Sequence, residues 1–224
     1  MSKLIHARFT ENGDSGWNGK AQAGDQTGNE VSVTDFYTAP WDFALRYFNW
    51  ETAKEFVMIA MKLAACVKVG YDQSQRNDLY KELKAYNFDV DKFILSGKKV
   101  ETDCSAFVYA CLCVLLPNLR SDKNAPTTAD MEEYYKNKGF TVLKGYDYLN
   151  GKKNITGDIM VRAGHHTAIF QSDVDFVAKY PTEVESALTI IAQAVLKGTF
   201  GNMPERKDKI YRAVQDKVNS LVTN

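Results

Sequence analysis

Apolar residues follow one another almost without a break over 106–116, and Pro117 ends the run. The run is too short to span a membrane and predicts a buried helix. Asp103 and Ser105 flank the expected helix start, where side chains that cap free backbone N–H groups are favoured. Cys104 is therefore expected to lie in the first turn of a buried helix.

Other parts of the chain show either helical spacing or short apolar runs. Apolar positions three and four apart predict an amphipathic helix over 51–69, with Gly70 as its expected stop. Further helices are expected over 77–86 and 126–137. Strands are expected near the N-terminus and over 31–37, 140–143, 158–162 and 166–170. Helices followed by strands predict an α+β domain.

A cysteine in the first turn of a helix has the chemistry of a nucleophile. The free N–H groups and the helix dipole stabilise a thiolate, so we expect the pKa of Cys104 to be lowered. Cys66, Cys111 and Cys113 lie in apolar helical patterns and are interpreted as core residues. Cys111 and Cys113 point to different faces of one helix, which argues against a bridge between them.

The base that activates this cysteine must come from His6, His165 or His166. The last two lie where two short strands are joined by an Ala-Gly turn. Alternation along a strand puts them on opposite faces, so only one can face Cys104. A cysteine followed along the chain by a distant histidine is the order of papain-like peptidases.

A third residue should orient the imidazole, and the sequence does not place it. An upstream polar group such as Asp72, Gln73 or Asp25 is a candidate. Pairs of cysteine and histidine without a third member also exist.

These blocks resemble the NlpC/P60 and CHAP group of cell-wall cysteine peptidases. The matching segments are Asp103-Cys104-Ser105 before the apolar helix, Gly157-Asp158-Ile159, and the strand that begins at His166. Segments 24–31 and 70–76 resemble endolysins of phages that infect Gram-positive bacteria. The resemblance implies a papain-like catalytic domain over 1–175, with Cys104 as nucleophile and His166 as base. It also implies that Tyr71 belongs to the substrate site, beside the thiolate.

The segment 184–224 follows a boundary at 180–183 and contains three helical patterns. It resembles the Cpl-7 type of cell-wall-binding repeat in Lys197-Gly198-x-Phe200-Gly201-Asn202, Glu205-Arg206-Lys207 and Val214-Gln215-x-x-Val218-Asn219. The resemblance implies a small three-helix module that binds peptidoglycan muropeptide, with Asn202, Arg206 and Gln215 as candidate binding residues.

This copy of the repeat departs from the pattern at Met203-Pro204, where a glycine is expected, and in a shorter link before its third helix. Binding is therefore expected to differ in strength or detail. About forty residues make a small core, so docking or oligomerisation through this module is expected to help it. The structural alternative is a helical tail that caps the first domain.

Composition narrows the partners. Lysine plus arginine equals aspartate plus glutamate at 28 each, and a net charge of zero argues against nucleic acid as the main partner. No signal peptide or membrane-inserting stretch is recognisable, so we expect synthesis in the host cytoplasm and, as the resemblance implies, release to the wall by a holin. No cofactor or metal is expected: zinc patterns are missing, and the loop over 12–19 has few acidic ligands for calcium.

The combined expectation is a phage endolysin that hydrolyses amide bonds in the peptide part of Gram-positive peptidoglycan. The bond lies within the stem or cross-bridge, or between muramic acid and L-alanine. Three alternatives remain open: a bacterial autolysin or tail-associated hydrolase, a non-catalytic wall-binding protein that keeps the fold, and a cytoplasmic cysteine transferase.

Overall fold

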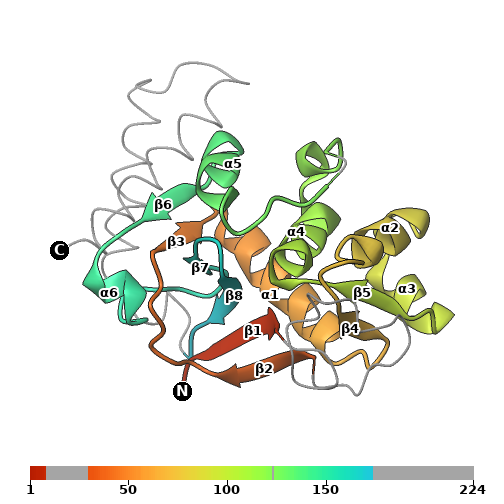
Figure 1. Ribbon diagram of the computed structural model, residues 1–224, viewed down its shortest axis with the longest axis horizontal. Helices are drawn as coiled ribbons and strands as arrows, with labels where there is room; N and C mark the ends of the chain where they lie inside the picture. Colours follow the sequence, from red (N-terminus) through yellow and green to blue (C-terminus); the bar gives the residue numbers. More distant parts are fainter. Residues whose placement is uncertain (9–29, 123, 174–224) are drawn as a thin grey trace, which may run out of the picture.

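The structure is a computed structural model that describes residues 1–8, 30–122 and 124–173 (Figure 1). Several predictions lie outside these residues. They concern the loop over 12–19, the orienting candidate Asp25, and the C-terminal three-helix module with Asn202, Arg206 and Gln215.

The described residues form a mixed α+β structure, which confirms the predicted α+β class. Six antiparallel strands make one sheet in the order β2-β1-β8-β7-β3-β6. They are β1 (Lys3–Ala7), β2 (Val31–Asp35), β3 (Phe43–Arg46), β6 (Thr141–Leu143), β7 (Ile159–Arg162) and β8 (His166–Gln171). The sheet therefore draws strands from both ends of the domain, and β3 is the member that the sequence did not predict.

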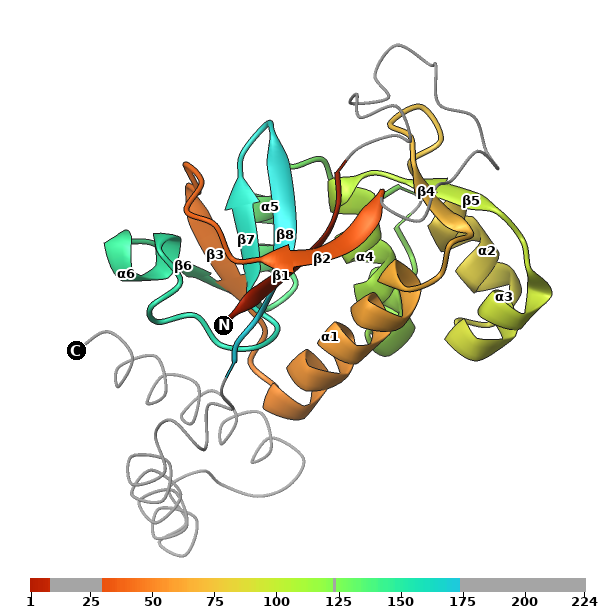
Figure 2. The same ribbon diagram turned by 90° about the horizontal axis from the view of Figure 1, so that it is seen from below.

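Most of the helices lie on one side of this sheet, whereas α6 packs on its other face, and a small parallel pair of strands lies beside the larger group of helices (Figures 1 and 2). The helices are α1 (Trp50–Ala64), α2 (Asp78–Ala85), α3 (Val90–Ser96), α4 (Cys104–Leu115), the 3-10 turn η1 (Pro117–Leu119), α5 (Met131–Asn137) and α6 (Tyr146–Leu149). The parallel pair is β4 (Val69–Tyr71) and β5 (Val100–Thr102). Helices α1 and α4 pack on each other and on strands β1 and β8.

Helix α4 is the predicted buried helix. Every residue from Cys104 to Cys113 is buried, as expected of a helix that is apolar on all faces. The Asp103 side chain caps it by accepting a hydrogen bond of 2.7 Å from the Ala106 N–H. The local signals of cap and apolar run were therefore sufficient to find this element.

Helix α1 ends at Ala64, so the prediction that it runs to position 69 and stops at Gly70 is wrong. Gly70 lies inside β4, where it pairs with Glu101 of β5. A tight turn separates the helix from this strand, with a 3.0 Å hydrogen bond from the Val69 N–H to the Cys66 carbonyl. Pairing with a distant segment overrode the local helical pattern.

The Gly157-Asp158 pair has a structural explanation. The Asp158 carboxylate accepts hydrogen bonds of 2.8 and 2.7 Å from the Arg46 guanidinium, and both side chains are almost fully buried. Gly157 has a φ of +93°, and a Cβ there would lie 2.7 Å from the Cβ of Ala53 in α1. These two residues fix the entry of β7 against α1 and β3.

Candidate active site

Cys104 is the first residue of α4 and directly follows β5 and the Asp103 cap. Its side chain is almost fully buried, and the backbone N–H groups of Ser105 and Thr167 are directed at its sulfur. These donors favour a thiolate. The sulfur thus lies where the start of α4 meets β8, with two backbone N–H donors directed at it.

Burial nevertheless dominates the acidity of this thiol. Desolvation and then the charge of Asp103 raise the pKa of Cys104 to about 12, against the two N–H groups and the Arg76 charge that lower it. The expectation of a lowered pKa is therefore wrong for the substrate-free site. Cys104 rests as a neutral thiol and needs a base during attack.

His166 is the first residue of β8 and immediately precedes Thr167, whose backbone N–H is directed at the Cys104 sulfur. Burial, followed by the charge of Arg8, lowers the pKa of His166 to about 4, while Asp103 opposes the shift. Its ring stacks on Trp41 at a centroid distance of 6.2 Å. His166 is consequently a neutral imidazole near pH 7, as a general base must be.

His6 supplies the partner that the sequence did not place. Its Nδ1 atom lies 2.9 Å from the Nε2 atom of His166, and its own Nε2 lies 3.2 Å from the Thr34 hydroxyl. The His6 side chain is 1% exposed, and burial, then the charge of His166, lowers its pKa to about 3. Three side chains from β8, β1 and β2 therefore form one hydrogen-bonded row.

The sheet explains why these side chains meet. Strand β1 pairs antiparallel with β8, with Ile5 opposite Ile169. Because side chains alternate along a strand, His6 and His166 fall on the same face. No sequence signal links two histidines that are 160 positions apart; only the pairing of β1 with β8 does so.

The upstream candidates for the third residue have other partners. Asp72 accepts hydrogen bonds from the backbone N–H and the hydroxyl of Ser74. The Gln73 amide donates a 3.0 Å hydrogen bond to the Tyr71 hydroxyl. These contacts argue against Asp72 and Gln73 as orienters of His166.

Tyr71 lies near Cys104, although 33 positions separate them in the chain. Strands β4 and β5 set Tyr71 opposite Thr102, two residues before the cysteine. Burial, then the charge of a Cys104 thiolate, raises the pKa of the Tyr71 phenol. Tyr37, whose ring lies 6.1 Å from that of His6, also has its pKa raised by burial and by Cys104. Both tyrosines therefore lie close enough to Cys104 for a charge on its sulfur to raise their pKa.

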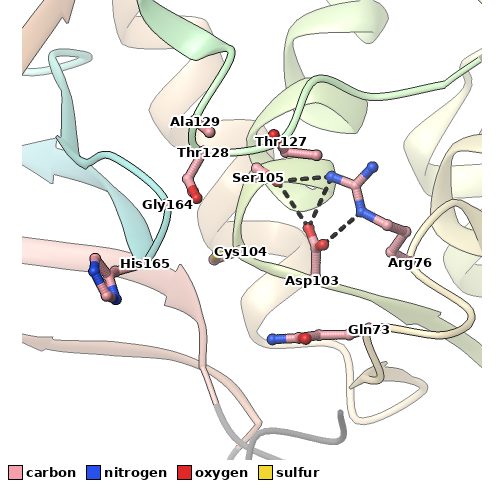
Figure 3. A pocket seen from close by; sticks show the side chains of 10 residues that line it. All are labelled: Gln73, Arg76, Asp103, Cys104, Ser105, Thr127, Thr128, Ala129, Gly164 and His165. Carbon is pink, nitrogen blue, oxygen red and sulfur yellow. Dashed lines mark hydrogen bonds and ion pairs between the residues drawn. The ribbon is translucent and has the colours of Figure 1, made fainter.

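An open pocket of about 340 Å³ adjoins the cysteine (Figure 3). Its wall comprises Gln73, Arg76, Asp103, Cys104, Ser105, Thr127, Thr128, Ala129, Gly164 and His165. In Figure 3 the Thr128 hydroxyl and the Gln73 amide lie on opposite sides of Cys104. His165 belongs to the exposed turn between β7 and β8, so it lines the rim of the pocket and is not part of the histidine row.

The described residues contain no group of three or more histidine, cysteine, aspartate or glutamate side chains that could hold a metal ion. None of the helices in the described part of the chain is long and apolar enough to cross a membrane.

Comparison with known proteins adds two matches. The family model of the endolysin-like domain matches residues 4–175, and that of the CW_7 repeat matches residues 190–222. No curated protein and no solved structure gives a significant match to the chain.

Proposed function

The chain belongs to the endolysin-like domain family, and on this premise we propose that it is a phage endolysin acting on the bacterial cell wall through a Cys-His mechanism. The proposed reaction is hydrolysis of an amide bond in the peptide part of peptidoglycan. The observation that carries the proposal is the meeting of Cys104 with β8, whose first residue, His166, is hydrogen-bonded to His6.

The arrangement supports a papain-like catalytic domain of the NlpC/P60 or CHAP type. Cys104 begins a buried helix and His166 begins a strand of an antiparallel sheet, and the resemblance implies that these two elements carry the nucleophile and the base. We assign the catalytic domain to residues 1–175 and the wall-binding module to residues 184–224.

The hydrogen-bonded row of His166, His6 and Thr34 defines which ring nitrogens carry a hydrogen. For Nδ1 of His166 to accept a proton, its Nε2 must carry the hydrogen and donate it to Nδ1 of His6. The Nε2–H of His6 then donates to the Thr34 hydroxyl oxygen. His6 is thus the proposed positioning residue, which fixes the ring and tautomer of His166.

The proposed chemistry follows from two neutral partners. Because the Cys104 thiol and the His166 imidazole are both uncharged at pH 7, proton transfer accompanies attack of the sulfur on the amide carbonyl carbon. The imidazolium then protonates the leaving amine as the C–N bond breaks. Water, deprotonated by His166, hydrolyses the thioester and releases the free thiol.

The oxyanion of the tetrahedral intermediate needs hydrogen-bond donors. N–H groups in the first turn of a helix have no partner within the helix, so the Cys104 N–H is available for this role. The hydroxyl of Tyr71, a residue that lies near Cys104, accepts from Gln73 and can direct its own hydrogen into the same space.

The CW_7 repeat supports a second proposal, that the C-terminal module holds the enzyme on the wall. Muropeptide of a Gram-positive host is the proposed ligand, with Asn202, Arg206 and Gln215 as contact residues. We propose that the protein is made in the host cytoplasm and reaches the wall after holin-mediated release.

Clearing of a Gram-positive wall suspension tests the catalytic proposal. The parent protein is expected to clear the walls, whereas Cys104→Ala and His166→Ala are not; Cys66→Ala, at a free cysteine that does not line the pocket, is the matched control and is expected to keep activity. Mass analysis of the released fragments identifies the bond. Clearing by Cys104→Ala would refute the mechanism, and binding to walls without clearing by the parent would favour a non-catalytic wall-binding protein.

A further inference from the structure

We infer that the pocket beside Cys104 accepts an uncharged hydrogen-bonding group, so that the preferred stem peptide carries a carboxamide where a free side carboxylate could stand. The inference rests on the proposed function and specifies its substrate.

The two formal charges in the pocket wall compensate each other. The Arg76 guanidinium contacts both carboxylate oxygens of Asp103, at 2.5 and 3.4 Å (Figure 3). It also donates to the Ser105 hydroxyl at 2.7 Å and to the carbonyls of Ala125 and Pro126 at 2.9 Å each. Most of its N–H groups are therefore engaged within the protein, and its charge is matched before any substrate arrives.

The carboxylate is engaged to the same degree. Asp103 accepts from Arg76, from the Ala106 N–H at 2.7 Å and from the Ser105 hydroxyl at 3.1 Å. Neither member of the pair is available to a charged ligand group without losing contacts that cap α4. Arg8 acts on His6 and His166, but it is not among the residues that line this pocket.

Neutral polar groups complete the wall. Gln73 uses one amide hydrogen on Tyr71 and retains its amide oxygen and a second N–H. Thr127 donates to Asp130 and retains acceptor capacity, and the Thr128 hydroxyl is directed into the pocket beside Cys104 (Figure 3). These groups both donate and accept, as an entering carboxamide also does.

A carboxylate in the same place would bind less favourably than a carboxamide. It would lose water without gaining a compensating cation from the pocket wall, and it would stand near Asp103 and the negative charge that develops on the oxyanion. A carboxamide has nearly the same shape and none of this cost. Discrimination between the two therefore follows from charge and not from size.

Two synthetic stem peptides that differ only in this carboxamide or carboxylate test the inference with the full-length protein. We expect kcat/KM for the amidated peptide to be higher by about tenfold to a hundredfold, as for an unpaired polar group in a partly dry site. Equal rates, or a preference for the free acid, would overturn the inference and leave the proposed function intact. Cleavage of neither peptide would count against the proposed function itself.

A change of rim charge provides the second measurement. His165→Lys adds a cation to the exposed rim of the pocket without disturbing the Arg76–Asp103 pair, and is expected to narrow the preference by improving cleavage of the carboxylate peptide. His165→Gln, a neutral change at the same position, is expected to leave the preference as it is. An unchanged preference in His165→Lys would mean that the pocket is not where the carboxyl group binds.

Discussion

The Nδ1 atom of His6 lies 2.9 Å from the Nε2 atom of His166 and joins the first strand of the domain to the last. The contact occupies Nε2 of His166, so that in the proposed mechanism Nδ1 is the nitrogen that accepts the proton of Cys104. A histidine in the orienting position differs from a carboxylate, since a neutral imidazole fixes the tautomer without adding negative charge.

The first prediction concerns this contact. His6→Ala is expected to lower kcat by roughly 10- to 1,000-fold with little change in KM, because the ring of His166 loses its orientation while the enzyme still binds its substrate. His6→Asn keeps an acceptor oxygen near the place of Nδ1 and is expected to recover part of the loss. Steady-state kinetics on soluble muropeptide measures both; equal losses in the two variants would argue for a purely structural role.

The pH profile of activity is the second prediction. Attack requires neutral His166, whose pKa is lowered to about 4 by burial. Activity is therefore kept as the pH falls from 7 to 5 and is lost as the pH falls further through about 4. Short assays of kcat/KM, paired with circular dichroism to follow the folded fraction, measure this limb. An acid limb near the ordinary histidine value of about 6.5 would contradict it.

Stability should depend on pH through His6. Its pKa is about 3 in the folded protein, against about 6.5 when unfolded, so below pH 6.5 the unfolded chain binds the extra proton. The free energy of unfolding contributed by neutral His6 is complete above pH 6.5 and declines as pH falls toward 3, by on the order of 4 kcal/mol. Urea unfolding of His6→Asn from pH 7 to 4 should show a shallower decline than the parent; identical slopes would refute this assignment.

The buried ion pair behind β7 gives a fourth prediction. Asp158→Asn leaves the Arg46 guanidinium without a counter-charge in a buried place and is expected to cost about 3–5 kcal/mol of unfolding free energy. Asp91→Asn removes the partner of Lys62 from an exposed pair and is expected to cost less than about 1 kcal/mol. Chemical denaturation compares the two. A loss of unfolding free energy in Asp158→Asn as small as that in Asp91→Asn would mean that water solvates the Arg46 guanidinium in place of the carboxylate.

Gly157 and Gly97 form a matched pair for the fifth prediction. Both have positive φ, but a Cβ at Gly157 would meet Ala53 at 2.7 Å, whereas one at Gly97 would meet nothing within 4 Å. Gly97→Ala is expected to cost about 1 kcal/mol from backbone strain alone. Gly157→Ala adds a clash with α1, for a total of roughly 2–4 kcal/mol. Thermal unfolding measures the difference, and equal costs would show that α1 shifts easily.

Local signals predicted the parts of the site that depend on neighbouring residues. The cap at Asp103 and the apolar run after it identified the helix of Cys104, and the Ala-Gly turn identified the strand of His166. Both signals act over a few residues, so distant packing could not conceal them.

Long-range pairing decided what the sequence left open. Strands β4 and β5 have three residues each and stand side by side only in the fold, so a helical pattern over 51–69 concealed the strand at Gly70. His6 was recognised as a histidine but not as a partner of His166. The order of the strands in a sheet cannot be read from the positions of His6 and His166 along the chain.

Strand β8 lies between β1 and β7 in the sheet. A chain growing on the ribosome therefore carries Cys104 without the proposed base until His166, 62 positions later, has been added. In the proposed mechanism, Cys104 gains its base only when β8 inserts beside β1, and pairing between strands so far apart in the chain forms slowly. The proposed activity would therefore begin only with the finished domain.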